Sequence, residues 1–174
     1  MKSDIIQIDN RGKGFALALE ETEKAARYRE LGEKETLHLR LCAEEMLSLV
    51  RSVTGELQAA FWLESEGPAF DLHLSTQTVM DREKRNNLIA STTSRKNEAA
   101  KTFLGKLRDA FETAMASEPD TGIPEDALDD LANHTIEIPE WDEYEQSILR
   151  KVADQVRIGI RGRTVEMTVS RRFG

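Results

Sequence analysis

Residues 57–77 decide the fold of this chain, because they switch the hydrophobic pattern from the period of a helix to the period of a strand. They read LQAAFWLESEGPAFDLHLSTQ. Apolar or small residues occupy every second position on both sides of a turn, at Leu57, Ala59, Phe61 and Leu63 and again at Phe70, Leu72, Leu74 and Thr76. Such alternation puts one set of side chains on each face of a strand. Since residues 65–68 carry a turn signal, the segment predicts a β-hairpin with one buried face.

The segment before this hairpin predicts a long amphipathic helix. Its apolar residues keep the i, i+3, i+4, i+7 spacing of one helix face, at Leu39, Cys42, Ala43, Met46, Leu47, Val50 and Val53. Gly55 is expected to end the helix. Further upstream, residues 5–8 predict a short strand and residues 15–29 predict a first helix.

The segments after the first hairpin predict further helices and a second hairpin. Helices are expected from Ala99 to Met115, near residues 125–131 and over residues 142–153. Alternating apolar residues then predict two strands that turn at Gly162, with Val156, Ile158 and Ile160 before the turn and Val165, Met167 and Val169 after it. Strands and helices are mixed without a βαβ rhythm. We therefore expect an α+β two-layer sandwich, with helices on one face of a mixed, mostly antiparallel sheet.

Length and charge exclude several functional classes. The 174 residues suit one domain that spans the whole chain, and its net charge of -8 argues against non-specific binding to nucleic acid or to an anionic membrane. No apolar stretch approaches the roughly 18 residues of a membrane-spanning helix, and the first residues lack the apolar region of a secretory signal. Cys42 is the single cysteine, so an internal disulfide is excluded. We expect a cytoplasmic protein.

Positive and negative charges are concentrated in two neighbouring segments. Residues 82–108 contain eight Lys or Arg residues, whereas residues 109–149 contain thirteen Asp or Glu residues and no Lys or Arg. The second segment is expected to hold a looped acidic insertion, at about residues 116–141. Two interpretations stay open. The insertion forms a functional surface or a gate over a pocket, or it is a solvated decoration.

Glu45 is the first candidate for chemistry. On its helix, the neighbours four residues away on each side are Leu41 and Leu49. Apolar neighbours desolvate a carboxylate and raise its pKa, which suits a general base. The alternative is a carboxylate at the edge of the apolar stripe whose tip reaches water. Cys42 lies on the core stripe and is expected to pack rather than react.

The order of these elements and the helix residues 39–50, LRLCAEEMLSLV, resemble the Bergerat-fold ATP-binding domains of histidine kinases, gyrase and mismatch-repair ATPases. Within that family the chain is most similar to the small serine-kinase anti-sigma factors, whose helix has the form Leu-x-x-Ala-x-x-Glu-x-x-x-Asn. Residues 148–160 and the sequence GRTVEMTV at 162–169 are similar to the family's closing helix and strand pair. The resemblance covers about residues 5–77 and 142–172.

The resemblance implies roles for four positions. The family's helix glutamate polarises the attacking water, and Glu45 takes its place. The family's asparagine four residues later ligates magnesium, but here Leu49 offers no oxygen to the cation. The family's Asp-x-Gly-x-Gly motif binds the adenine amino group through its aspartate, which Asp81 matches, although bulky residues replace both glycines. Thr164 matches the threonine that closes the adenine pocket. The family's glycine-rich lid is absent.

The resemblance therefore implies the fold without the full activity, because phosphoryl transfer depends on positioning and charge neutralisation. We expect a degenerate histidine-kinase-like ATPase domain without efficient ATP hydrolysis. Its role would be that of a regulatory module whose partner is another protein, and a homodimer is compatible with this role. It would bind no cofactor, or ATP or ADP weakly, and the helix offers no magnesium ligand.

Two alternatives stay open. One is an ATP-binding protein or serine kinase with relocated ligands, in which Glu45 is the base and Asp81 holds adenine. In this alternative the phosphates would be held by Arg95, Lys96 or Lys101. The other is a structural subunit without a ligand.

Overall fold

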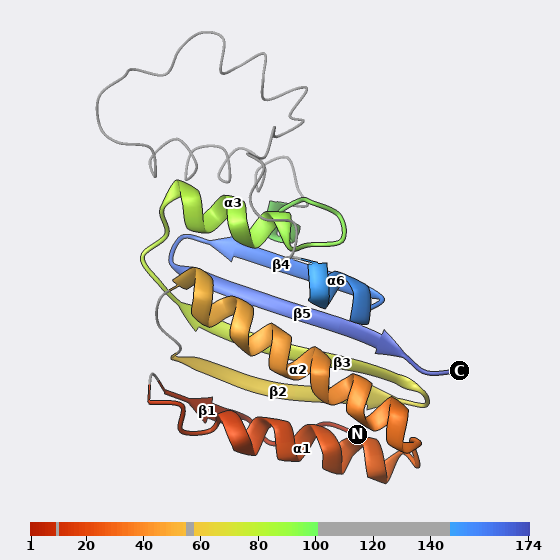
Figure 1. Cartoon of the computed structure of the whole chain (residues 1–174). Coiled ribbons are helices and arrows are strands. Elements are labelled where there is room, and N and C mark those ends of the chain that lie inside the picture. The colour runs from red at the N-terminus through yellow and green to blue at the C-terminus, as the bar shows by residue number, and fades with distance from the viewer. Residues whose placement is uncertain (10, 55–57, 101–146) are drawn as a thin grey trace, which may run out of the picture.

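Figure 1 shows the computed structural model of the chain, in which helices pack on one five-stranded sheet. The structure describes residues 1–9, 11–54, 58–100 and 147–174. In chain order its elements are β1 (Ile6–Ile8), α1 (Phe15–Tyr28), α2 (Glu33–Thr54), β2 (Ala59–Glu66), β3 (Ala69–Gln77), α3 (Arg82–Ala90), the 3-10 turn η1 (Glu98–Ala100), α6 (Ser147–Val152), β4 (Gln155–Arg161) and β5 (Thr164–Arg172).

The strands lie in the order β1-β2-β3-β5-β4, and every neighbouring pair among them is antiparallel. The α+β class is therefore confirmed, whereas the expectation of a mixed sheet is wrong for the described strands. The reason is the place of β5. Because β5 is antiparallel to both β3 and β4, the strands β3 and β4 run in the same direction, but β5 separates them and no parallel pair forms.

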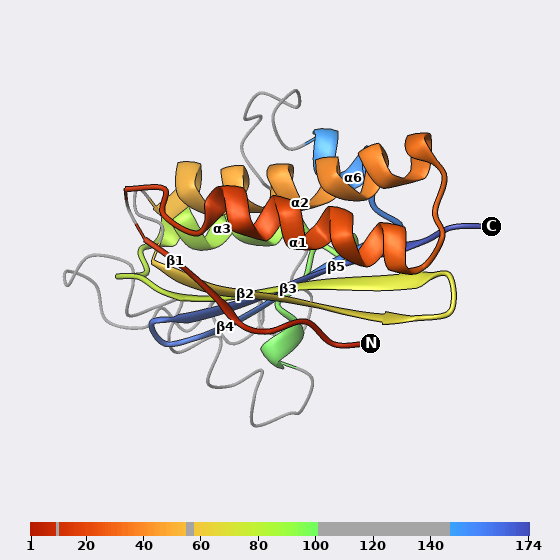
Figure 2. The same ribbon diagram turned by 90° about the horizontal axis from the view of Figure 1, so that it is seen from below.

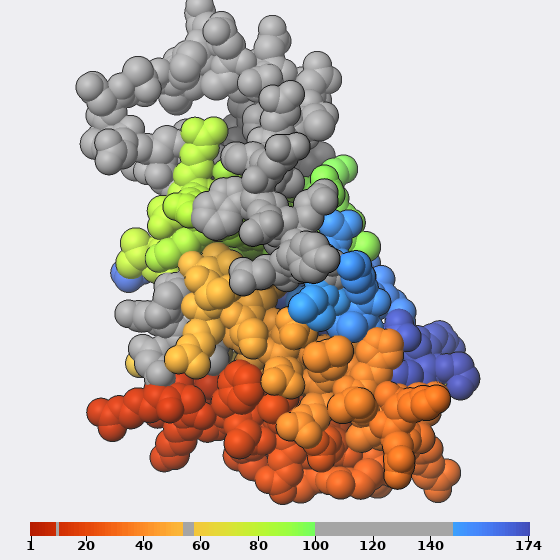
Figure 3. Space-filling model, viewed as in Figure 1, coloured from red at the N-terminus to blue at the C-terminus, as the bar shows by residue number. Residues whose placement is uncertain are grey.

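The helices form one layer on one face of this sheet. Figure 2 shows α1, α2, α3 and α6 on one side of the strands and η1 on the other side. In the space-filling view of Figure 3, the side chains of α1, α2 and α6 adjoin one another in front of the sheet. The longest described helix, α2, has 22 residues, and no described helix combines the length and the apolarity that a membrane span requires.

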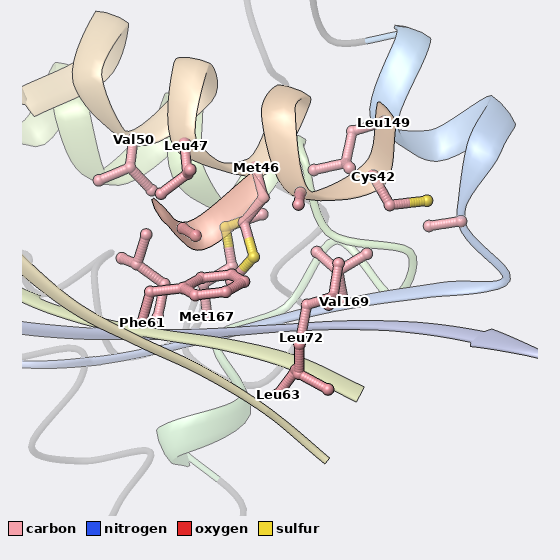
Figure 4. Close-up of a cluster of buried hydrophobic side chains, with 14 of the residues drawn as sticks. Cys42, Met46, Leu47, Val50, Phe61, Leu63, Leu72, Leu149, Met167 and Val169 are labelled. Carbon is pink, nitrogen blue, oxygen red and sulfur yellow. The ribbon is translucent and has the colours of Figure 1, made fainter. Parts of the chain in front are cut away.

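One hydrophobic core joins the two layers. In Figure 4, Met46, Leu47 and Val50 of α2 lie over Phe61 of β2 and Met167 of β5. The ten residues that the two hairpins and the central helix predict for one core all belong to this cluster, namely Leu39, Met46, Leu47, Val50, Phe61, Leu72, Leu74, Val156, Ile158 and Met167. The two hairpins therefore share one core, as expected.

The elements after β3 differ from the expected ones. The helix α3 (Arg82–Ala90) forms in the basic segment, where the periodicity predicts none, and its N-terminus is capped by Asp81. Residues 98–100 form a 3-10 turn rather than the start of a long helix, and the rest of that expected helix lies outside the described residues. The acidic insertion and the short helix near residues 125–131 lie outside them too. The last expected helix is described from Ser147 to Val152 as α6.

The segment between α3 and η1, residues 92–97, closes the outer edge of β4, and we call it the edge segment. The Thr93 backbone N–H donates to the Val156 carbonyl at 2.9 Å, and its hydroxyl oxygen accepts from the Val156 N–H at 2.7 Å. Further along, the Asn97 amide donates to the Ile160 carbonyl at 3.0 Å and accepts from the Ile160 N–H at 2.8 Å. Unpaired edge strands invite pairing with other chains, so these two side chains stand in for a further strand.

The shared core predicts that Met46→Asp destabilises the protein by at least about 3 kcal/mol, because the new carboxylate would be buried without a partner. Met46 is 0% exposed, whereas Leu37 on the same helix is 66% exposed. Leu37→Asp is therefore the matched control, and it should leave the free energy of unfolding nearly unchanged. Urea unfolding followed by circular dichroism measures both variants. Equal losses in the two would contradict the described core.

From the contacts of the edge segment we expect Asn97→Ala to lower the free energy of unfolding by about 2 kcal/mol, because it leaves the buried N–H and C=O of Ile160 without their Asn97 partners. Ser94→Ala is the control, since the exposed Ser94 hydroxyl of the same segment donates to the Glu98 carboxylate and not to β4 in the described part of the chain. Hydrogen exchange at the Ile160 amide should speed up in Asn97→Ala alone. An unchanged exchange rate would show that the amide pairing does not hold this edge.

Candidate functional site

Glu45 lies in the middle of α2, on the flank of the helix that faces away from α1. The α1 flank is marked by Arg40, whose guanidinium lies 2.9 Å from the Glu23 carboxylate of α1. The opposite flank is marked by Cys42, whose thiol donates to the Val152 carbonyl of α6 at 3.5 Å. Residues three apart on a helix share a face, so Glu45 lies on the α6 side of the helix layer.

The pKa of the Glu45 carboxyl is raised above its ordinary value. The main cause is desolvation by partial burial, and the like charge of Glu44 adds to it. Leu41 and Leu49 are both partly buried on either side of it. This is the direction that the helix spacing predicts. A carboxylate in such surroundings takes up a proton more readily than an exposed one does, which is the property that a general base requires.

The next turn of α2 does not fit a magnesium ion. Leu49 is partly buried and packs against the hydrophobic core. The Ser52 hydroxyl, further along the helix, donates to the Leu49 carbonyl at 3.0 Å and is thus engaged with the backbone. Within the described part of the chain, no group of three or more His, Cys, Asp or Glu side chains is arranged to hold a metal ion. No magnesium-dependent step can be derived from these residues.

Asp81 caps a helix. Its carboxylate accepts a hydrogen bond from the Lys84 backbone N–H at 2.8 Å and lies 3.8 Å from the Lys84 ammonium. A carboxylate at this position satisfies a free N–H of the first helical turn. One oxygen of Asp81 is therefore used to start α3, directly after the strand that leads out of the first hairpin.

Thr164 lies on the face of the sheet opposite the helices. It pairs with Gln77, and the next pair along these strands, Thr76 with Val165, is buried. Val165 belongs to the core under the helices, and successive side chains of a strand point to opposite faces. Thr164 and Glu45 are thus separated by the sheet, so this threonine does not close a pocket beside Glu45.

The structure describes two of the three proposed phosphate ligands. Arg95 and Lys96 are exposed in the edge segment along β4. Arg95 has φ of 53°, in the left-handed region that non-glycine residues seldom adopt. Lys101 lies outside the described residues. In the described part of the chain, no hydrogen bond or ion pair joins any of these residues to Glu45 or Asp81.

Cys42 is confirmed as a packing residue. It is 0% exposed, and burial raises the pKa of its thiol to about 12. A thiol of this kind stays protonated at neutral pH and is a poor nucleophile.

A shallow cleft of about 600 Å³ lies at the end of the sheet, between the β1–α1 turn and the ends of β2 and β3. Lys13, Gln58 and Gln77 are among the residues that line it. Glu45, Asp81 and Thr164 do not, so the cleft gathers none of the expected nucleotide ligands.

A row of four side chains crosses the sheet on the face opposite the helices. The strand registers place Trp62, His73, Thr168 and Arg157 next to one another on β2, β3, β5 and β4. The rings of Trp62 and His73 stack, with centroids 5.0 Å apart and planes 13° apart. His73 Nδ1 lies 3.2 Å from the Thr168 hydroxyl. We call these four residues the cross-strand row.

Two atoms of the cross-strand row, His73 Nε2 and Arg157 Nε, are buried and have no hydrogen-bond partner among the described residues. Burial lowers the pKa of His73, while the charges of Glu64 and Asp71 oppose this effect and those of Arg157 and Lys2 add to it. The imidazole is therefore neutral near pH 7. Buried polar atoms usually have partners, which makes the cross-strand row unusual within the sheet.

The alternation in the sequence placed His73 on the polar side of its strand but did not identify the cross-strand row. The Trp62–His73 pair belongs to one hairpin, and the sequence contains the signal for the short turn that pairs its two strands. The pairing of β3 with β5, which adds Thr168 and Arg157, depends on a contact between segments far apart in the sequence.

A comparison with known protein families finds no family that matches the chain, and a comparison with curated proteins finds no matching relative.

The raised pKa of Glu45 predicts that Glu45→Gln stabilises the protein at pH 7. A carboxyl whose pKa is higher in the folded state contributes stability below its unfolded pKa, and this contribution is lost as the pH rises through the folded value. The increase in the free energy of unfolding should stay below about 1 kcal/mol, because the Glu45 carboxyl is partly solvated. It should vanish below pH 4, where Glu45 is protonated in both states.

The control for this effect is Glu66→Gln, which removes an exposed carboxylate at the end of β2. Melting temperatures of both variants and of the parent protein between pH 3 and pH 8 provide the measurement. A gain that is the same at every pH would contradict a raised pKa at Glu45.

Proposed function

We propose that this chain is a degenerate histidine-kinase-like ATPase domain that acts as a regulatory, protein-binding module without efficient ATP hydrolysis. The element order supports the Bergerat-type framework, since a strand, two helices and a hairpin are followed by further helices and a closing hairpin. The single helical layer over an antiparallel sheet is compatible with it. The motif in α2 adds the resemblance at Glu45.

The main support for the proposed lack of ATP hydrolysis is the residue at position 49, which is a leucine. The resemblance puts a magnesium ligand there, and an aliphatic side chain packs against the core instead. Phosphoryl transfer has little covalent chemistry for a protein to do and depends on metal ions and on positioned charges. Asp81 is engaged as a helix cap and Thr164 lies beyond the sheet, so the adenine ligands of the resemblance are not gathered beside Glu45 either.

In the proposed role the domain keeps its folded core, and its outer surfaces are what it offers to a partner. Surfaces of a rigid α+β domain are suited to binding another protein, which is the partner class that the resemblance to anti-sigma factors implies. The binding function would follow from a particular site on one of these surfaces, and not from the fold itself. A second copy of the chain belongs to the same class of partner.

One observation favours the alternative of an active ATPase or serine kinase with relocated ligands. The Glu45 carboxyl has the raised pKa of a general base, although no ligand for a nucleotide lies in the described residues around it. The alternative then requires the phosphates and the metal ion to be held by residues outside the described ranges.

The proposal predicts no measurable magnesium-dependent ATP hydrolysis and a melting temperature that ATP or ADP shifts equally with and without magnesium. Ligand binding stabilises the folded state by mass action, so a metal-bridged nucleotide would raise the melting temperature further. A coupled phosphate-release assay and thermal melts of the full chain provide the two measurements. Turnover that needs magnesium and disappears in folded Glu45→Gln would refute the proposal and establish the alternative.

A further inference from the structure

The face of the sheet opposite the helices carries the cross-strand row. Of the described elements, η1 alone lies on it (Figure 2). It covers β4 at Gly159, where an added Cβ would lie 3.6 Å from the Cβ of Ala99. The cross-strand row lies two residues along β4 from this place, and its four side chains are half-buried.

The cross-strand row has the composition of an interaction hot spot. Tryptophan and arginine are the residue types most enriched among side chains that dominate binding between proteins. Here Trp62 is held flat against His73, and Arg157 lies two strands beyond His73. All four residues belong to paired strands, so their positions are fixed before a partner arrives. A fixed surface loses less conformational entropy on binding.

Both row nitrogens without a hydrogen-bond partner among the described residues, His73 Nε2 and Arg157 Nε, are hydrogen-bond donors. When the Thr168 hydroxyl donates to His73 Nδ1, the neutral imidazole carries its proton on Nε2, which is then a donor. Arg157 Nε is a donor in every state. A buried donor without an acceptor costs stability, and a docked acceptor at Arg157 would remove that cost at this residue.

The arginine of the row indicates that the acceptor is a carboxylate. Glu64 is engaged with the Lys2 ammonium at 2.9 Å, and Asp71 accepts a hydrogen bond from the Ser170 hydroxyl. Arg157 has no ion pair among the described residues, and the guanidinium group is the side chain best suited to bind a carboxylate with two hydrogen bonds.

The row also sets a length. It crosses four strands and therefore three inter-strand spacings, or about 14 Å. In an extended segment, residues i and i+4 lie on the same side, about 13 Å apart. An apolar residue over Trp62 and an acidic residue at Arg157 would thus be four positions apart in an extended partner.

We infer that the cross-strand row is the docking surface for the partner protein, and that it binds an extended acidic segment. An apolar side chain of the segment covers the Trp62–His73 stack, and a carboxylate four residues away pairs with Arg157. This inference rests on the proposed function as a protein-binding module and names the surface and the chemistry of its partner.

The test uses the full chain and two synthetic peptides. Both have seven residues and blocked ends, with one leucine in a background of serine and threonine. They differ at one position, four residues after the leucine, which is glutamate in one peptide and glutamine in the other. Titration followed by NMR should shift the Trp62 indole and His73 ring signals. The glutamate peptide should bind at least tenfold more tightly than the glutamine peptide.

Two variants on β4 separate the row from general charge attraction. Arg157→Gln should remove the preference for glutamate, and Arg157→Lys should keep part of it. Arg161→Gln is the matched control, because Arg161 lies on the same strand and the same face, four residues away from Arg157, and this variant should bind like the parent protein. Circular dichroism melts check that each variant is folded.

The inference is overturned if neither peptide binds, if both bind equally, or if Arg161→Gln weakens binding as much as Arg157→Gln does. A second copy of the chain as the true occupant would appear in light scattering as a dimer that Arg157→Gln dissociates, and this result would also overturn it. Tighter binding of an oligothymidine than of the glutamate peptide would do the same. None of these outcomes affects the nucleotide measurements, so the proposed loss of ATP hydrolysis stands or fails separately.

Discussion

The alternation of side chains along the five antiparallel strands is the constraint on which the rest of the structure depends. On β5, Val165, Met167 and Val169 are buried under the helices, while Thr164 and Thr168 lie on the opposite face. A shift of the register by one residue would exchange the two faces. The burial of the apolar set therefore fixes the polar set at the same time. The hydrophobic core and the cross-strand row are two consequences of one register.

The edges of the sheet complete this arrangement. At one edge, β1 is only three residues long, which leaves little edge to pair with another chain. At the other edge, Thr93 and Asn97 bond to the outward groups of β4. One face is occupied by helices and both edges are protected, so the polar face is the broad surface that the described elements leave to a partner.

Those elements that depend on neighbours in the sequence could be predicted. The hairpin at residues 57–77 and the helix before it follow from local periods, and the raised pKa of Glu45 follows from leucines one helical turn away. The helix α3 could not be predicted from periodicity. It is short and polar, and only Leu88, Ile89 and Ala90 at its end and one charged residue, Arg85, are buried.

Thr164 shows where a match by position misleads. The resemblance assigns it to an adenine pocket, yet Val165, Met167 and Val169 already form the apolar set of its strand in the sequence. The alternation alone therefore puts Thr164 on the polar face. A local physical pattern constrained this residue more tightly than the order of elements did. The pairing of β3 with β5 is different, because nothing within either segment specifies it.

The same alternation lets the polar face of the sheet change without disturbing the core. Trp62 follows Phe61, and Thr168 follows Met167, so these core residues of the strands have a chain neighbour on the polar face. A substitution on that face leaves the buried side chains in contact, because the two sets point in opposite directions. Glu45 and Leu49 lie in the helix layer, and the core separates them from the cross-strand row. Changes around Glu45 and changes in the cross-strand row are therefore independent of each other, and the fold tolerates both as long as the core between them is kept.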